Sequence, residues 1–351
     1  GKAKIETLLN ESVKRKKLSE EEKTKLLGNV KTLSSLEKIS SSDLVIEAVF
    51  EDLELKQSLY KKIEPYLKKN AILASNTSTL PITKLSEALQ DSNRFIGIHF
   101  FSPVEKMNLV EIIKSKQSND KSLAVALDYV SLLKKTPIVV NDSRGFYANR
   151  CIIPYINEGL RMLNEGIEPA LIENSAKHIG MPVGPLQLLD ELSVSLALNV
   201  AKETKEALGS EYEETGTESI LLEMSQKNRL GRKELAGFYE YDEKGRRLKL
   251  WEGLRDLNGV SKPANITTET VKNRLAYVQA LEAARALEEN ILLSVEEGDV
   301  GGILGWGCLI WAGGPFSWLD HVGHENVVAE CQKLFDQYGA RFAPPKVIKD
   351  L

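Results

Sequence analysis

The chain has 351 residues, of which 42 % are hydrophobic and 27 % charged, a composition typical of a soluble globular protein with two or three domains. Its net charge of −4 argues against a general nucleic-acid binder, which would show a clear basic excess. The cysteines and histidines have no metal-ligand or disulfide spacing, and no apolar run reaches the roughly 18 residues of a membrane span. The sequence therefore predicts no metal, no membrane span and a reducing compartment.

Helical and strand patterns alternate through the first part of the chain. The first forty residues favour helix, and Ser19 and Glu22 form a capping-box pattern. A basic cluster at residues 14–17 (KRKK) fits a solvated helix end better than a nucleic-acid patch. Strands are then expected over 43–49, 71–75, 95–101, 108–115 and 136–140, and helices over 51–67, 80–89 and 120–135. This alternation predicts an α/β fold with a mostly parallel sheet covered on both faces.

The strand pattern stops near Ser143, and helical patterns dominate the rest of the chain. Residues 145–206 favour helices, and residues 237–251 alternate around a DEKG turn as a β-hairpin would. Helical patterns then continue to the end. The helical part also contains an internal repeat, because residues 149–166 match residues 273–290 at a constant offset.

The repeat extends beyond these two segments. Gly184-Pro185 and Asp190 match Gly314-Pro315 and Asp320 in the same order. Chance similarity between amphipathic helices is the alternative, but the collinear matches argue against it. We therefore expect a duplicated all-α domain. The predicted division gives a sheet domain over 1–142, a helical substrate and catalytic domain over 143–262, and a second, structural helical repeat over 263–351.

Polar residues follow three of the expected strands at their carboxyl ends, over 47–51, 75–79 (SNTST) and 99–102. In an open parallel sheet, ligands bind beyond the carboxyl ends of the strands, so we expect these residues to line one edge. The Ser and Thr residues of 75–79 would equally suit a helix N-cap. Asn149 lies in the first turns of a helix, where a hydrogen-bonding task or simple exposure would explain this poor helix former.

His99 and Glu111 lie inside two apolar runs, FIGIHFF and NLVEII. A turn centred on Glu105 would fold the second run back along the first and set residue 99 opposite residue 111. A carboxylate on an apolar face is costly without a partner, and His99 could supply one. Such a pair suits the removal of a proton from a hydroxyl. The alternatives are a satisfied core histidine and an ion pair of Glu111 with Lys106 or Arg94.

These residues and the segments around them resemble a known family. The chain is similar to the L-3-hydroxyacyl-CoA dehydrogenase part of the fatty-acid β-oxidation enzymes, and most to the multifunctional type that also carries an enoyl-CoA hydratase domain. The similarity covers nearly the whole chain in order and is carried by DLVIEAVFEDLELK, ASNTSTLPIT, HFFSPVEKMNLVEII, GFYANR, GMPVGPLQLLD and GRKELAGFYEY. It implies a partial Rossmann-type sheet followed by the family's helical domain in duplicate, NAD as cofactor and an acyl-CoA as substrate.

The resemblance also implies a role for each matching residue. His99 would be the general base that removes the proton from the 3-hydroxyl, and Glu111 would orient it and stabilise its charge. Ser78 and Asn149 would hold the substrate while hydride passes from C3 to NAD, giving a 3-ketoacyl-CoA. The implied cofactor contacts are Glu51, Lys56 and Asn76, and the implied contacts to the CoA phosphates are Lys16 and Lys17.

One departure from the family lies at the amino terminus. The family begins its dehydrogenase domain with a strand, a G-x-G-x-x-G turn and a helix, which bring backbone amides to the pyrophosphate of the cofactor. This sequence contains no such motif. We therefore expect a truncated chain that lacks the first β-α-β unit and binds NAD weakly, so that the activity belongs to the parent protein.

Two other functions compete with this one. Another β-hydroxyacid dehydrogenase of similar fold would use a lysine in its helical domain, and the His99–Glu111 pair argues against it. A non-catalytic binding or scaffold protein would fit the missing glycine turn, but not the retention of Ser78, His99, Glu111 and Asn149. The resemblance allows a dimer or a thiolase subunit as partner. It implies a cytoplasmic location in a bacterium and a mitochondrial or peroxisomal one elsewhere.

Overall fold

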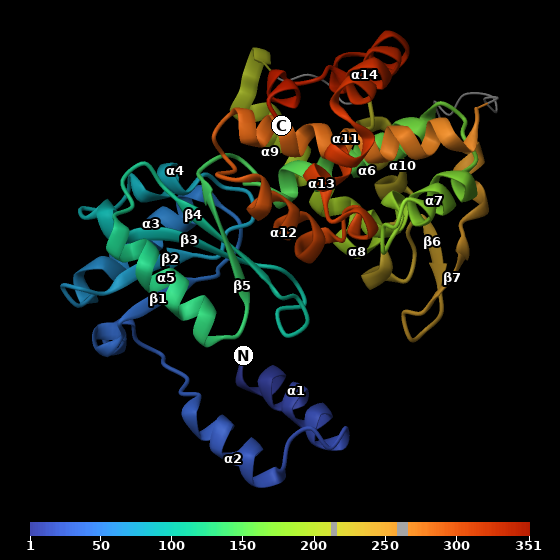
Figure 1. Ribbon diagram of the computed structural model, residues 1–351. Helices are drawn as coiled ribbons and strands as arrows, with labels where there is room; N and C mark the ends of the chain where they lie inside the picture. The colour runs from blue at the N-terminus through green and yellow to red at the C-terminus, as the bar shows by residue number, and fades with distance from the viewer. Residues whose placement is uncertain (212–215, 258–265) are drawn as a thin grey trace.

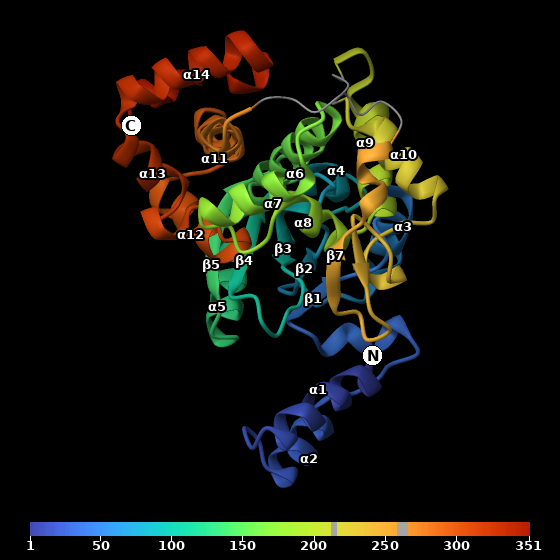
Figure 2. The same ribbon diagram turned by 90° about the vertical axis from the view of Figure 1, so that its right-hand side faces the viewer.

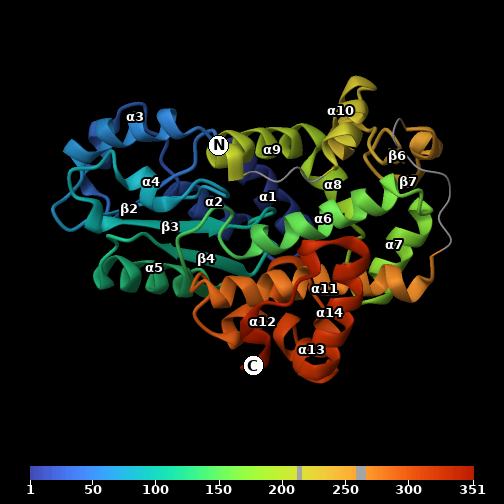
Figure 3. The ribbon, with the colours of Figure 1, turned by 90° about the horizontal axis from the view of Figure 1, so that it is seen from above.

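The computed structural model describes residues 1–211, 216–257 and 266–351 (Figure 1). A sheet with its helices forms one side of the molecule, and helices form the other, as Figure 3 also shows from above. The first two helices project away from both sides. The sequence-based boundary at 262–263 lies outside the described residues and stays a prediction. Within the described ranges, no helix has both the length and the apolar character needed to cross a membrane.

Five strands form one sheet in chain order. They are β1 (Leu44–Glu47), β2 (Ile72–Ser75), β3 (Phe95–Phe100), β4 (Leu109–Lys114) and β5 (Thr136–Asn141). β1, β2 and β3 run parallel, β4 is antiparallel to β3, and β5 is parallel to β4. Each predicted strand is present, and the mostly parallel sheet is confirmed. Its one reversal is the β3–β4 hairpin, which carries the His99 and Glu111 segments.

The helices of this side lie where the sequence predicts helix. They are α1 (Lys2–Lys14), α2 (Glu20–Asn29), α3 (Leu53–Ile63), α4 (Ile82–Ser86) and α5 (Asp120–Leu132). The capping box is confirmed, because the Ser19 amide donates to Glu22 at 2.8 Å and the Glu22 amide donates to the Ser19 hydroxyl at 3.1 Å. The helical pattern of the first forty residues is interrupted at Lys16, whose φ of 56° begins the turn into α2.

The two faces of the sheet belong to separate apolar cores. On one face, side chains such as Ile98 and Val110 pack with Val130 of α5. On the other face, Leu109 and Ile113 belong to a larger core that continues into the helical side. Because side chains alternate along a strand, His99 and Glu111 lie on this second face. The sheet therefore aims both polar side chains toward the helices that follow it in sequence.

The helical side contains two sets of consecutive helices. The first helical unit comprises α6 (Ala148–Asn164), α7 (Pro169–His178), α8 (Pro185–Leu192) and α9 (Val194–Leu208), and the second comprises α11 (Thr268–Glu288), α12 (Val295–Trp306), α13 (Pro315–Val322) and α14 (His324–Tyr338). Between them lie α10 (Glu218–Gln226) and the predicted hairpin, β6 (Tyr239–Tyr241) and β7 (Arg247–Leu250). α6 packs against α11, and α12 packs against β5 and α6 (Figure 2).

A buried or half-buried carboxylate caps the third helix of each unit. In the first unit, Glu173 of α7 accepts the amide hydrogen of Leu186 at 2.9 Å. In the second, Asp299 of α12 accepts the amide hydrogen of Phe316 at 2.7 Å. Each helix begins at the proline of a Gly-Pro pair. Without the carboxylate, the amides of its first turn would have no hydrogen-bond partner. The Gly-Pro match in the sequence therefore corresponds to a shared local structure.

The long helices α6 and α11 are joined by reciprocal ion pairs. Arg274 of α11 binds Glu158 of α6 at 2.6 Å, and Arg150 of α6 binds Glu282 of α11 at 2.6 Å. Arg274 and Arg150 occupy equivalent positions of the repeat, as do Glu158 and Glu282. Each helix therefore gives an arginine and receives one, as in the self-complementary interface of a two-fold symmetric pair.

Candidate active site

The β3–β4 hairpin brings His99 and Glu111 together in the register that the sequence predicts. The two residues are direct partners across the antiparallel pair, and Nδ1 of His99 lies 2.7 Å from Oε2 of Glu111. His99 is 4 % exposed and Glu111 is fully buried. A carboxylate can only accept, so the Nδ1–H of His99 donates to it, and the Nε2 atom of the neutral ring keeps its lone pair.

The second oxygen of Glu111 is held by the start of α6. Its Oε1 atom accepts the amide hydrogens of Tyr147 at 3.1 Å and of Ala148 at 2.8 Å. The first amides of a helix have no partner within the helix, and the helix dipole favours a negative charge there. Glu111 is thus fixed by the sheet on one side and by the first helical unit on the other. Sequence reasoning did not find these two amides, because a backbone N–H leaves no mark in residue type.

The Nε2 atom of His99 is available for chemistry. Within the described residues it has no hydrogen-bond partner, and it is not one of the fully buried polar atoms. The ring of Phe101 lies 4.6 Å away and that of Phe146 5.8 Å away, centroid to centroid. Apolar rings therefore border the imidazole, while its free nitrogen remains open to a ligand.

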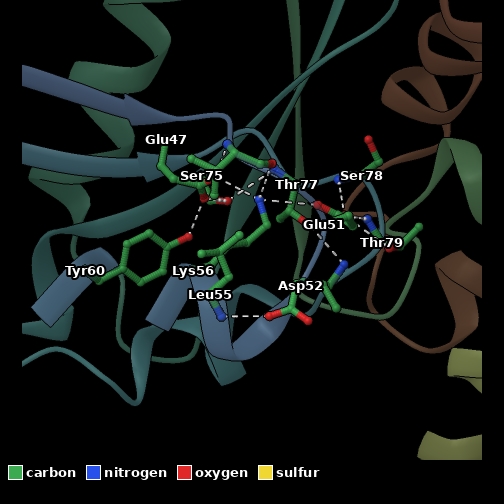
Figure 4. A network of polar contacts seen from close by, with 12 residues as sticks. Glu47, Glu51, Asp52, Leu55, Lys56, Tyr60, Ser75, Thr77, Ser78 and Thr79 are labelled. Carbon is green, nitrogen blue, oxygen red and sulfur yellow. Dashed lines mark hydrogen bonds and ion pairs between the residues drawn. The ribbon is translucent and has the colours of Figure 1, made fainter. Parts of the chain in front are cut away.

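The loop after β2 is held by Glu51, as Figure 4 shows. Oε1 of Glu51 accepts hydrogen bonds from the Thr77 hydroxyl at 2.5 Å, the Ser78 amide at 2.9 Å and the Thr79 amide at 3.0 Å. Burial alone would raise the pKa of this carboxyl, but these hydrogen bonds and the Lys56 ammonium outweigh it and lower the pKa. Glu51 is therefore an anion that collects the donors of the SNTST loop.

Lys56 lies behind Glu51 and is almost fully buried, with 1 % of its surface exposed. Its ammonium contacts Glu47 at 2.7 Å, the Val49 carbonyl at 3.3 Å and Glu51 at 3.3 Å (Figure 4). Two hydrogen bonds, to Glu47 and Val49, and an ion pair with Glu51 compensate the buried ammonium. The predicted contact of Lys56 with the cofactor stays a prediction, and in this structure Lys56 reaches the site through Glu51.

Asn149 connects α6 to the same loop. Its amide nitrogen donates to the Ser78 carbonyl at 2.8 Å. Of the two explanations for an asparagine in the first turn of α6, a hydrogen-bonding task is therefore the one that the structure supports. Asn76 accepts the Phe100 amide hydrogen at 2.8 Å through its side-chain oxygen. Across the described chain, neither the Ser78 hydroxyl nor the Asn76 side-chain nitrogen has a hydrogen-bond partner. Both groups are free to meet a ligand.

The structure therefore brings together six of the nine predicted site residues directly, and Lys56 joins them through Glu51. His99, Glu111, Ser78, Asn149, Glu51 and Asn76 belong to one set of contacts along the carboxyl edge of β1, β2 and β3. Lys16 and Lys17 are not brought to this edge. They lie in the turn between α1 and α2, which pack on each other and project away from the sheet (Figures 1 and 2). Their predicted contact with CoA phosphates stays a prediction.

A side chain of the first helical unit faces the same edge. Burial raises the pKa of Glu203 on α9, and the nearby carboxylate of Glu51 raises it further, whereas Arg144 lowers it. Glu203 and Glu51 are therefore close enough for their charges to interact. The sequence did not indicate Glu203 or Arg144 as neighbours of the site, since only the folded arrangement of α9 brings them there.

Comparison with known proteins identifies the family. Residues 1–143 match the NAD binding domain of 3-hydroxyacyl-CoA dehydrogenase, and residues 145–241 match the C-terminal domain of the same enzyme. The (S)-3-hydroxybutyryl-CoA dehydrogenase of Ralstonia eutropha is 36 % identical, and the match covers 69 % of this chain and 85 % of that one at a TM-score of 0.64. This chain belongs to the 3-hydroxyacyl-CoA dehydrogenase family. Its sheet is the family's NAD-binding domain, and NAD is its cofactor.

Two further solved structures match this chain over nearly its whole length, including both helical units. The dehydrogenase part of multifunctional enzyme 1 from C. elegans is 28 % identical, with 99 % of this chain and 80 % of that one covered at a TM-score of 0.67. A 3-hydroxybutyryl-CoA dehydrogenase from Escherichia coli is 21 % identical, with 99 % and 89 % covered at a TM-score of 0.84, and shares the fold. The arrangement of a sheet and two helical units is thus found in other proteins of this fold.

The described residues fit one end of NAD. Asn76 offers an unpaired amide beside Ser78, and Glu51 is about one-third exposed in its side chain, so both can meet the polar ribose and nicotinamide groups. The pyrophosphate end has no counterpart of the G-x-G-x-x-G turn in this sequence. The family's cofactor therefore fits the loops after β1 and β2 by their chemistry.

Proposed function

We propose that this dehydrogenase oxidises the 3-hydroxyl of an L-3-hydroxyacyl-CoA to the 3-ketone, with NAD as the hydride acceptor. One observation carries the proposal. His99 has one nitrogen bonded to a buried carboxylate and the other free at the carboxyl edge of the sheet. This arrangement gives a base of defined tautomer at the edge where α/β sheets bind ligands.

The chain's own residues divide the work as follows. Nε2 of His99 takes the proton of the 3-hydroxyl, and the resulting imidazolium is stabilised by Glu111 at Nδ1. The amides of α6 keep Glu111 in place throughout. The Ser78 hydroxyl donates a hydrogen bond to the substrate oxygen, and Asn149 holds the Ser78 loop and the substrate. NAD supplies the chemistry of hydride acceptance from C3.

The cofactor and CoA contacts follow the same division. Glu51 and Asn76 would hold the ribose and nicotinamide side of NAD, and Lys56 would act on it through Glu51. Lys16 and Lys17 would meet the CoA phosphates, an assignment supported by their positive charge and exposure. Acyl-CoA is therefore the proposed substrate class, and its chain length is not part of the proposal.

We also propose that the helical side arose by duplication. The reciprocal pairs of Arg150 and Arg274 support it, and so does a backbone match. Ser193 and Gly323, at equivalent positions, both have positive φ, with values of 90° and 85° and ψ of 142° and 134°. In this proposal the three domains span 1–142, 143–262 and 263–351, and the second helical repeat is structural and has no counterpart of the His99–Glu111 pair.

The proposed setting is a multifunctional enzyme of fatty-acid β-oxidation. It is supported by the match to the dehydrogenase part of the C. elegans multifunctional enzyme over 99 % of this chain. An enoyl-CoA hydratase domain, a dimer and a thiolase subunit are the proposed associated parts and partners. The proposed location is the cytoplasm of a bacterium, or a mitochondrion or peroxisome in other cells.

The test is a single substitution in the complete gene product that contains this chain. His99→Gln should lower the rate of NADH-dependent acetoacetyl-CoA reduction by at least about 10²-fold, the usual contribution of a general base. His178→Gln is the matched control, because His178 is exposed at the end of α7 and should leave the rate unchanged. An unchanged rate in His99→Gln would remove His99 from the mechanism. A folded wild type with no turnover would favour the non-catalytic alternative.

A further inference from the structure

The second helical unit contains an unusual helix next to the site. α12 has glycine at positions 298, 301, 302 and 305, although each glycine costs a helix roughly 1 kcal/mol relative to alanine. Because helix propensity opposes four glycines in a helix of 12 residues, close packing is the expected reason for them. The reason lies in what α12 touches.

α12 holds Tyr147 from two directions. The Tyr147 hydroxyl donates to the Gly298 carbonyl at 2.9 Å, and its ring packs edge-on to Trp306 at 5.5 Å. A Cβ atom on Gly301 would lie 2.9 Å from the Tyr147 ring and 2.9 Å from Cδ1 of Ile138 on β5, so a larger residue there would crowd both side chains. Tyr147 is fully buried, and its own amide donates to Glu111. The contact with α12 therefore acts on a residue that fixes the carboxylate.

A second contact reaches the same pair through the sheet. A Cβ atom on Gly305 would lie 2.9 Å from Leu109 and 3.8 Å from Phe101. Leu109 is two residues before Glu111 on β4 and shares its face, and the Phe101 ring packs on the His99 ring. Glycine at position 305 lets α12 lie close to Leu109 on β4 and near Phe101, the ring that packs on His99.

α12 is itself fixed at both ends. Glu297 in its first turn accepts the Val139 amide hydrogen from β5 at 3.1 Å. Trp306 at its last residue donates its indole N–H to Gln279 of α11 at 2.9 Å, and Gln279 is fully buried. The helix therefore spans from the edge strand of the sheet to the long helix of its own unit, and its position is set by both.

We infer that α12 is a positioning element for the His99–Glu111 pair. The Gly298 carbonyl and the Trp306 ring of α12 hold Tyr147, and Gly305 lets the helix lie close to Leu109 of β4, so that α12 aligns the Tyr147 amide and the Glu111 strand with the imidazole. The second helical unit, which has no counterpart of the His99–Glu111 pair, thus acts on the reaction through Tyr147. The catalytic consequence rests on the proposed function, whereas the geometric part does not.

The test compares two neighbouring glycines of α12. Gly301→Ala places a methyl group against Tyr147, whereas Gly302→Ala places one 2.7 Å from Pro315, at the start of α13 and away from the pair. Both changes give the same gain in helix propensity and a similar close contact. Gly301→Ala should lower kcat by roughly tenfold to a hundredfold, with a displaced pH profile of kcat and little change in KM. Gly302→Ala should keep the kcat and the pH profile of the wild type.

A second measurement separates this inference from the proposed function. With ¹⁵N-labelled histidine, and His99→Gln to assign the signals, NMR reports the tautomer and titration of His99 whether or not the protein turns over. Gly301→Ala should alter both, and Tyr147→Phe, which removes only the hydroxyl, should alter them to a smaller degree. The inference is overturned if His99 titrates identically in wild type and in both variants, or if Gly302→Ala has the same effect as Gly301→Ala. An inactive wild type with the expected NMR changes would overturn the proposed function alone.

Discussion

The two helical units share a framework and differ in what their first helices meet. Asn149 and Asn273 occupy equivalent positions near the starts of α6 and α11. Asn149 donates to the Ser78 carbonyl in the candidate site, whereas Asn273 donates to Glu330 of α14 at 2.9 Å. The same residue type therefore anchors the Ser78 loop in one unit and joins two helices in the other.

The difference shows which features belong to the scaffold and which to the chemistry. The carboxylate caps at Glu173 and Asp299 and the reciprocal arginines recur in both units, so they stabilise any copy of this helical arrangement. At the start of α6 the amides of Tyr147 and Ala148 bind the buried Glu111 of β4, whereas the start of α11 is capped by the Thr267 side chain. Equivalent positions should therefore respond differently to the same substitution.

The largest expected difference concerns the two equivalent arginines. Arg274 has no exposed side-chain surface and binds the buried Glu158, while Arg150 is 18 % exposed and binds Glu282 and the half-exposed Glu289. Arg274→Met should lower the free energy of unfolding by about 3 kcal/mol, because it leaves a buried carboxylate with fewer partners. Arg150→Met should cost only about 1 kcal/mol. Urea denaturation of both variants checks this, and equal losses would contradict the asymmetry.

The next comparison uses two equivalent aspartates and pH. Burial raises the pKa of Asp190 to about 6, although the amides of Phe238 and Tyr239 and the Tyr241 hydroxyl bind its ionised form. The folded state thus binds a proton more tightly than the unfolded state. The stability that this proton contributes is complete below about pH 4 and is lost as the pH rises through 6. Asp320, its equivalent in α13, is exposed.

The corresponding measurement is the unfolding free energy of Asp190→Asn and Asp320→Asn between pH 4 and 7. The stability of the wild type relative to Asp190→Asn should fall by about 2 kcal/mol over this range, since one pKa unit corresponds to 1.36 kcal/mol and part of the change lies below pH 4. Asp320→Asn is the matched control at the exposed, equivalent position. A flat difference for Asp190→Asn would show that this carboxyl titrates normally.

The smallest effect is expected for the two asparagines. Asn149→Ala removes the bond that anchors the Ser78 loop and should lower kcat for acetoacetyl-CoA reduction by roughly tenfold, about 1.4 kcal/mol in the barrier. Asn273→Ala should leave kcat unchanged and lower stability by about 1 kcal/mol, through the lost bond to Glu330. Steady-state kinetics and denaturation decide between them. An equal fall in kcat would mean that both act through the fold alone.

Much of the sheet could be predicted from sequence because its signals are local. Apolar runs of strand length separated by helical periods fix the order of β1 to β5, and symmetry about Glu105 gives the His99–Glu111 register. The repeat located the equivalent helices. The domain division stays a prediction, and the boundary at 262–263 falls on residues that the structure does not describe.

The contacts of the site that could not be predicted from the sequence are those made by backbone amides and by glycines. The amides of Tyr147 and Ala148 bind Glu111, and nothing in those residue types reveals it. Lys56 was assigned to the cofactor by resemblance, while the structure buries it between Glu47 and Glu51. Lys56 and Tyr60 are four residues apart and therefore lie on one face of α3. This spacing could have predicted a shared partner, which the structure shows to be Glu47.

The bond between the Tyr147 hydroxyl and the Gly298 carbonyl has a consequence for the timing of synthesis. The two residues are 151 positions apart. At roughly 5–20 residues per second, a ribosome makes Gly298 about 8 to 30 seconds after Tyr147. During that interval the growing chain already contains His99, Glu111 and the start of α6, but not the helix that braces them. His99 and Glu111 are therefore synthesised before α12, and the contact of Tyr147 with α12 can form only after that delay.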